Sequence, residues 1–104
     1  NIGKSFQLKI HIAELIVRFD LNQTDVIDSR VKHIKKTFKD LLKDSNFKRD
    51  NQLVEIIDSL VYCNNLSQDK KLVKKITELS ILIEDEKADD IDVINYNVWL
   101  KSLR

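Results

Sequence analysis

Residues 24–43, with the sequence TDVIDSRVKHIKKTFKDLLK, carry the clearest pattern in this chain. Apolar side chains recur there three or four residues apart: Ile27, Val31, Ile34, Phe38, Leu41 and Leu42. Because an α-helix completes a turn in 3.6 residues, this spacing places them all on one face of a helix. The stretch therefore predicts one long amphipathic helix that begins at Thr24 and ends near Lys43, with lysines on its opposite face.

Comparable patterns on both sides of this stretch predict four more helices, at about 5–20, 50–64, 67–83 and 90–103. Ser5, Thr24 and Ser67 are the expected N-caps. The chain contains one glycine and no proline, so the turn signals that sheets require are missing. We expect residues 1–104 to form a single all-α domain of a longer protein, built as a compact bundle or right-handed array of about five helices.

The first predicted helix carries two apolar stripes that lie side by side. The first stripe consists of Leu8, Ile12, Leu15, Ile16 and Phe19. The second stripe consists of Ile10, Ala13 and Val17. A helix this apolar is expected to have neighbours on more than one side. A second copy of the chain is one candidate for such a neighbour.

Charge is unevenly distributed, although the net charge is only +1. Residues 30–50 hold eight basic and three acidic side chains, and residues 84–92 hold six acidic side chains and one lysine. Four lysines share one side of the second predicted helix: Lys32, Lys36, Lys39 and Lys43. They predict either a solvated face or weak contact with phosphates, because arginine forks and interleaved aromatic residues are missing. The acidic stretch predicts a solvated helix end or a docking patch for a basic partner.

Residue types that carry chemistry are few and scattered. The two histidines, His11 and His33, fall on different predicted helices, and Cys63 is the single cysteine. No metal-binding spacing results, and Gly3, the single glycine, cannot supply a phosphate-binding loop. We therefore predict no enzymatic activity, no metal and no cofactor. We also predict no membrane segment, because no apolar run approaches the roughly 18 residues of a spanning helix.

A longer pattern, from Arg30 to Glu84, resembles a known family. The matching positions are Arg30, Val31, Ile34, Phe38, Lys39, Leu42, Lys43, Val54, Ile57 and Leu60. Their order is similar to the integrase-binding domain of PWWP-containing chromatin proteins, which is related to the N-terminal helical domain of transcription elongation factor S-II. The helix order also resembles tellurite-resistance TerB-type domains, although the paired Ala-Asp-Gly turns of those domains are missing.

The first resemblance implies a right-handed helical array that binds short disordered motifs of nuclear proteins through two inter-helix loops. The residues at these loops here are Leu42, Asp44, Ser45, Asn46 and Phe47 in the first, and Ile83, Glu84, Asp85 and Glu86 in the second. The second loop of the family is apolar and basic, whereas this one is acidic. The departure favours a partner motif with basic flanks.

Three hypotheses follow from these observations. The first is a protein–protein interaction module for disordered motifs of chromatin- or transcription-associated partners, which places the protein in the nucleus, with the cytoplasm as the alternative. The second is a nucleic-acid-associated domain that uses the four lysines. The third is a structural or oligomerisation domain in which the first helix pairs with a second copy.

Overall fold

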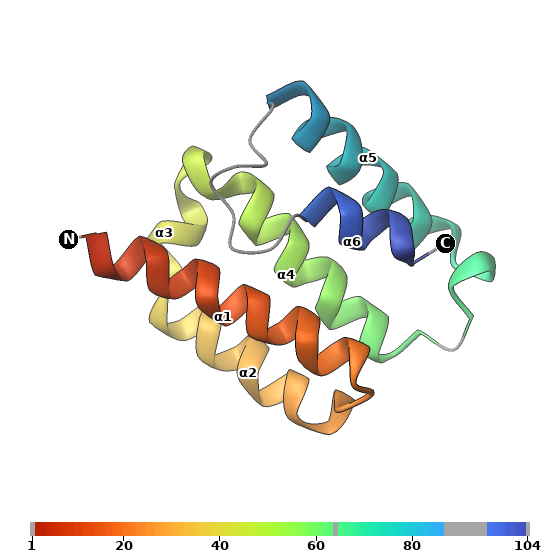
Figure 1. Ribbon diagram of the computed structural model, residues 1–104, viewed down its shortest axis with the longest axis horizontal. Coiled ribbons are helices and arrows are strands. Elements are labelled where there is room, and N and C mark those ends of the chain that lie inside the picture. The colour runs from red at the N-terminus through yellow and green to blue at the C-terminus, as the bar shows by residue number, and fades with distance from the viewer. Residues whose placement is uncertain (1, 64, 87–95, 104) are drawn as a thin grey trace.

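The helix predicted at 24–43 is present, but it is divided at Phe38. The computed structural model describes residues 2–63, 65–86 and 96–103 (Figure 1). Helix α2 spans Thr24–Thr37 and helix α3 spans Lys39–Lys43. The backbone of Phe38 between them has φ −110° and ψ 27°, outside the helical region. The hydrogen-bond ladder nevertheless continues, because Phe38 N donates to Ile34 O and Leu42 N donates to Phe38 O, both at 2.9 Å. The division is therefore a bend in one helical path.

The remaining elements confirm the all-α prediction. They are α1 (Ile2–Asp20), the 3-10 turn η1 (Ser45–Phe47), α4 (Lys48–Val61), the 3-10 turn η2 (Leu66–Gln68), α5 (Lys70–Glu86) and α6 (Tyr96–Ser102). The described residues form six α-helices and no strand, against about five helices predicted, because the second helix is divided. The acidic residues 84–86 were expected in a connection, but α5 continues through them, as the good helix propensity of glutamate allows.

The three residues predicted as N-caps do not cap their helices. Ser5 lies inside α1, Ser67 lies within η2, and Thr24 is the first residue of α2, whose N-terminus has no side-chain cap. The carboxamide of Asn65 accepts from Ser67 N at 3.2 Å, and the carboxylate of Asp69 accepts from Leu72 N at 3.1 Å. Asn and Asp are among the strongest N-caps, so Asn65 caps η2 and Asp69 takes the role predicted for Ser67 at the start of α5.

Helix α4 lies in the middle of the molecule (Figure 1). Helices α1 and α2 form an antiparallel hairpin whose two members both pack on α4. Helix α5 packs on α4 from the other side, and α6 packs on α5. The radius of gyration is 13.1 Å, which is the value expected for a compact chain of this length.

One hydrophobic core joins all these helices. Its largest fully buried side chains are Tyr96, Phe38, Leu8, Ile12, Leu15, Ile27, Ile34, Leu53, Ile56, Ile57, Ile76 and Leu79. In α6 the core contains Tyr96, Trp99 and Leu100, whereas Val98 is 65% exposed. The first part of the helix predicted at 90–103, through residue 95, lies outside the described residues.

A buried ion pair connects helices α1 and α4, which are far apart in sequence. Lys9 Nζ lies 2.7 Å from Asp50 Oδ1, and the Asp50 side chain is fully buried. The hydroxyl of Tyr96 donates to the same oxygen at 3.0 Å. The sequence placed Asp50 at the start of a helix, but α4 begins two residues earlier, at Lys48, so Asp50 faces inward. The carboxylate of Asp50 in α4 therefore binds side chains of both α1 and α6.

Candidate functional site

The two predicted loop segments lie at the same end of the molecule, where η1 and the end of α5 are found (Figure 1). Asp44, Ser45 and Asn46 are exposed there. One oxygen of the Asp44 carboxylate accepts from Asn46 N at 2.9 Å, so this oxygen shapes the turn. The side chains of Glu84, Asp85 and Glu86 lie outside the described part of the chain.

Two of the residues predicted to contact a partner lie inside the molecule. Leu42 and Ile83 both belong to the hydrophobic core. They face inward because each continues the apolar stripe of its helix. Phe47 is half-buried against the same core, and Lys9 Nζ lies 5.7 Å from the centre of its ring. These three side chains pack in or against the core beneath the loop. The residues of this loop that remain exposed for contact with a partner are Asp44, Ser45 and Asn46.

The four predicted phosphate-contacting lysines are all exposed: Lys32, Lys36, Lys39 and Lys43. They do not form one uniform stripe, because the bend at Phe38 separates the first two from the last two. Lys32 Nζ lies 3.1 Å from Asp28 Oδ2, so its charge is compensated. The arrangement gives no aromatic platform for bases and no arginine fork.

The Asp28 carboxylate receives two hydrogen bonds, and they lower its pKa below the ordinary value. The larger cause is the bond from Lys32, and the smaller is the bond from the hydroxyl of Tyr62, which donates at 3.1 Å. The same contacts raise the pKa of Lys32 and of Tyr62. A lowered folded-state pKa of Asp28 stabilises the fold above its unfolded pKa, and this contribution is lost as pH falls through the folded value.

Substitution of Lys32 by Met should raise the pKa of Asp28 toward its ordinary value. Tyr62→Phe should raise it less, because the tyrosine bond is the smaller cause. Titration of the Asp28 carboxyl by NMR checks both variants. All three side chains are solvent-exposed, so we expect little change in thermal stability. A larger shift in Tyr62→Phe than in Lys32→Met would contradict this order.

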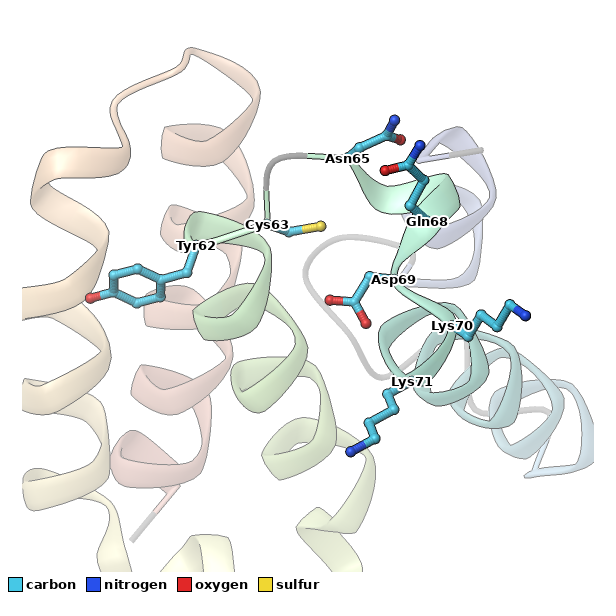
Figure 2. Close-up of a pocket in the computed structure, with 7 residues that line it drawn as sticks. All are labelled: Tyr62, Cys63, Asn65, Gln68, Asp69, Lys70 and Lys71. Atoms are coloured by element: carbon cyan, nitrogen blue, oxygen red, sulfur yellow. The ribbon is translucent and has the colours of Figure 1, made fainter.

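A shallow hollow of about 440 Å³ lies at the turn between α4 and α5. It is lined by Tyr62, Cys63, Asn65, Gln68, Asp69, Lys70 and Lys71. Figure 2 shows Cys63 and Asp69 pointing into the hollow, whereas Tyr62 and Lys70 point away from it. Because Asn65 and Asp69 hold backbone N–H groups of the turn, the polar lining is explained by capping.

A second hollow, of about 300 Å³, lies between α4 and α5. Its lining combines one core side chain with polar ones: Ile56, Asn51, Gln52, Glu55, Lys75 and Glu78. Glu55 is 2.9 Å from Lys35 Nζ, so its carboxylate already has a partner. The lining carries both signs of charge and gives no preference for one class of ligand.

The exposed face of α1 includes two residues of the second apolar stripe predicted for this helix, Ile10 and Val17. Four large apolar side chains of this helix are about half exposed or more: Phe6 (56%), Ile10 (45%), Val17 (47%) and Leu21 (60%), the last just beyond the helix end. Their spacing keeps them on one side of the helix. The second apolar stripe was predicted to be covered, but only its Ala13 is buried. The apolar periodicity correctly placed Ile10 and Val17 on one face of the helix. Whether another element buries that face depends on how the helices pack, which periodicity does not show.

Polar groups lie along the edges of this face. On one edge, Glu14 Oε2 lies 3.3 Å from Arg18 Nη2 and 3.7 Å from Arg30 Nη2 of α2. On the other edge, Asp20 accepts a hydrogen bond from Trp99 Nε1 of α6 at 3.1 Å. Exposed apolar patches rimmed by polar residues mark interaction sites in many proteins, and this row of half-exposed side chains with polar edges has that form.

The structure brings together the two histidines that the sequence left on separate helices. The rings of His11 and His33 are 5.5 Å apart between their centres. Among the described residues, no group of three or more His, Cys, Asp or Glu side chains could hold a metal ion. None of the described helices combines the length and apolar character that crossing a membrane requires.

Comparisons with protein-family models, with curated proteins and with solved structures each found no match.

Proposed function

We propose that this chain is a protein-interaction domain whose docking surface is the α1 face, formed by Phe6, Ile10, Val17 and Leu21. The observation that carries this proposal is the exposure of these four side chains on one side of a single helix. The opposite side of the same helix is fully buried in the core, so α1 is held rigidly. A rigid apolar row suits an amphipathic segment of another protein, because such segments present apolar side chains at the same spacing.

The size of the α1 face indicates a modest affinity. Full burial of a large apolar side chain is worth about 1.5–3 kcal/mol, so four half-exposed ones contribute roughly 3–6 kcal/mol. Association costs an estimated 4–15 kcal/mol in lost freedom of motion. The four side chains of this chain alone therefore give at most a weak complex, and the partner's own apolar side chains and polar contacts at the edge of the face supply the remainder.

Replacement of Ile10 and Val17 by Asp should reduce partner binding by a factor of about 10 or more, because charge enters the centre of the apolar row. A photo-crosslinking amino acid at position 6 reports the contact in cells, and the captured protein is then purified for a direct binding measurement. The matched control is Ile81→Asp with Val98→Asp, which adds the same charge at exposed apolar positions of α5 and α6.

The proposal requires that the crosslink and the direct binding are lost in the α1 variant and kept in the control. Equal binding by both variants would place the surface elsewhere. Sedimentation of the purified domain tests a second copy as the occupant, and a dimer that dissociates in the α1 variant would replace the proposed partner.

The turn formed by Asp44, Ser45 and Asn46 is a second candidate for partner contact. These side chains are exposed at the end of the molecule where α5 also ends. A disordered motif of a chromatin- or transcription-associated partner in the nucleus remains a prediction from the family resemblance. The same crosslinking amino acid at position 45 tests it. Crosslinks from position 45 that persist in the Ile10→Asp, Val17→Asp variant would favour this turn over the α1 face.

A further inference from the structure

Two arginines at the edge of the α1 face share one carboxylate. Arg18 and Arg30 both approach Glu14 Oε2, and Arg18 Nη1 also donates to Gln23 Oε1 at 2.6 Å. The three charged side chains are about one-third to two-fifths exposed, at 35% for Arg18, 43% for Arg30 and 30% for Glu14. Glu14 of α1 thus contacts both guanidinium groups, and Gln23 of the turn before α2 contacts that of Arg18, while both groups stay accessible to solvent.

This cluster has more donors than its own acceptors use. Each guanidinium has five N–H donors and a full positive charge, whereas in the described part of the chain the two share the one carboxylate of Glu14. Two lysines of α2 are better compensated, since Lys32 has Asp28, and Lys35 approaches both Glu55 and Asp58. The edge of the α1 face that adjoins α2 therefore carries excess positive charge.

The excess charge lies directly beside the apolar row. Residues three or four apart on a helix are neighbours on its surface, so Arg18 is adjacent to Leu21 of the apolar row and to Glu14, one turn to either side. On the opposite edge, the acidic Asp20 is engaged by Trp99 of α6. A segment lying on Val17 and Leu21 would meet arginines along one side.

We propose that the α1 face binds an acidic amphipathic segment, with its apolar side chains on Val17 and Leu21 and a carboxylate on Arg18 and Arg30. This inference rests on the proposed function and names the chemistry of the partner. Arginine fits because its planar fork can bind a carboxylate through two parallel hydrogen bonds, and these charge-assisted bonds are about twice as strong as neutral ones. Arginines beside an apolar anchor are also frequent hot spots in protein interfaces.

The test uses two synthetic peptides of about 18 residues, long enough to form a helix. One has leucines at helical spacing and glutamates along both flanks, and the other has glutamine in place of every glutamate. Fluorescence anisotropy measures their binding to the whole domain. We expect the acidic peptide to bind at least about tenfold more tightly at about 50 mM salt, and the difference to shrink to about twofold at about 500 mM salt.

Three variants assign the effect to the arginine pair. Arg18→Gln with Arg30→Gln should weaken the acidic peptide to the level of the glutamine peptide. Glu14→Gln should strengthen the acidic peptide about two- to fivefold, because a competing carboxylate is removed. The matched control, Lys70→Gln with Lys71→Gln, removes the same charge from exposed residues of α5 and should change neither affinity.

Each other outcome overturns the inference. Equal binding of both peptides that is lost in Ile10→Asp, Val17→Asp would leave the α1 face as the docking surface but reject the acidic partner. Acidic binding that falls equally in the lysine control would show non-specific attraction. Absence of binding by both peptides would reject the acidic segment, and the crosslinking experiment would then decide the proposed function by itself.

Discussion

Replacement of Asp50 by Asn is expected to lower the free energy of unfolding by about 3–5 kcal/mol. The variant keeps the shape of the side chain but leaves Lys9 charged in a site where its own side chain is only 10% exposed. The total free energy of unfolding of a domain is about 5–15 kcal/mol, so this loss is a large fraction of its stability. Urea unfolding followed by the fluorescence of the single tryptophan, Trp99, measures it, since that side chain is buried in the folded state.

A fully apolar replacement provides the control. Lys9→Met, Asp50→Leu and Tyr96→Phe together remove the charges and the hydroxyl that donates to Asp50. Apolar side chains of similar volume often replace a buried ion pair at little cost, so this variant should be more stable than Asp50→Asn. A loss below about 1 kcal/mol in Asp50→Asn would mean that the pair behaves like a surface ion pair.

The position of Asp50 also explains where prediction from the sequence stops. A polar residue after Phe47 and before an apolar run indicates a helix start, and α4 does begin nearby, at Lys48. The partners of Asp50, however, are Lys9 and Tyr96, which are 41 and 46 residues away. Local periodicity contains no information about these long-range contacts, because the contacts depend on how whole helices pack.

The same reasoning applies to the candidate site. Periodicity identified the core stripe of α1, including Leu8 and Ile12, because burial of that stripe is a property of the helix itself. It also grouped Ile10 with Val17, but their exposure follows from the absence of a covering helix among the described residues. The edge formed by Arg18 and Arg30 required the antiparallel pairing of α1 with α2, which the sequence alone did not define.

Phe38→Ala is the second substitution with a large expected effect, a loss of about 3–5 kcal/mol in the free energy of unfolding. The ring is 99% buried and lies 5.5 Å from the ring of His11, between centres. Its removal leaves a cavity at the bend between α2 and α3, where the backbone is outside the helical region and cannot collapse without breaking the bonds to Ile34 and Leu42. Urea unfolding followed by Trp99 fluorescence provides the measurement.

Two further variants test whether the loss of stability comes from the cavity that Phe38→Ala leaves at the bend. Phe38→Leu keeps most of the apolar volume and should cost less than half as much, about 1–2 kcal/mol. His11→Ala removes the neighbouring ring but only a half-buried one, so it should cost about 1 kcal/mol or less. If Phe38→Ala cost no more than Phe38→Leu, the bend would have closed over the cavity, and the division of the long helix would be a flexible joint. A full loss would instead show that the cavity at the bend stays open and that the packing of this ring stabilises the bend.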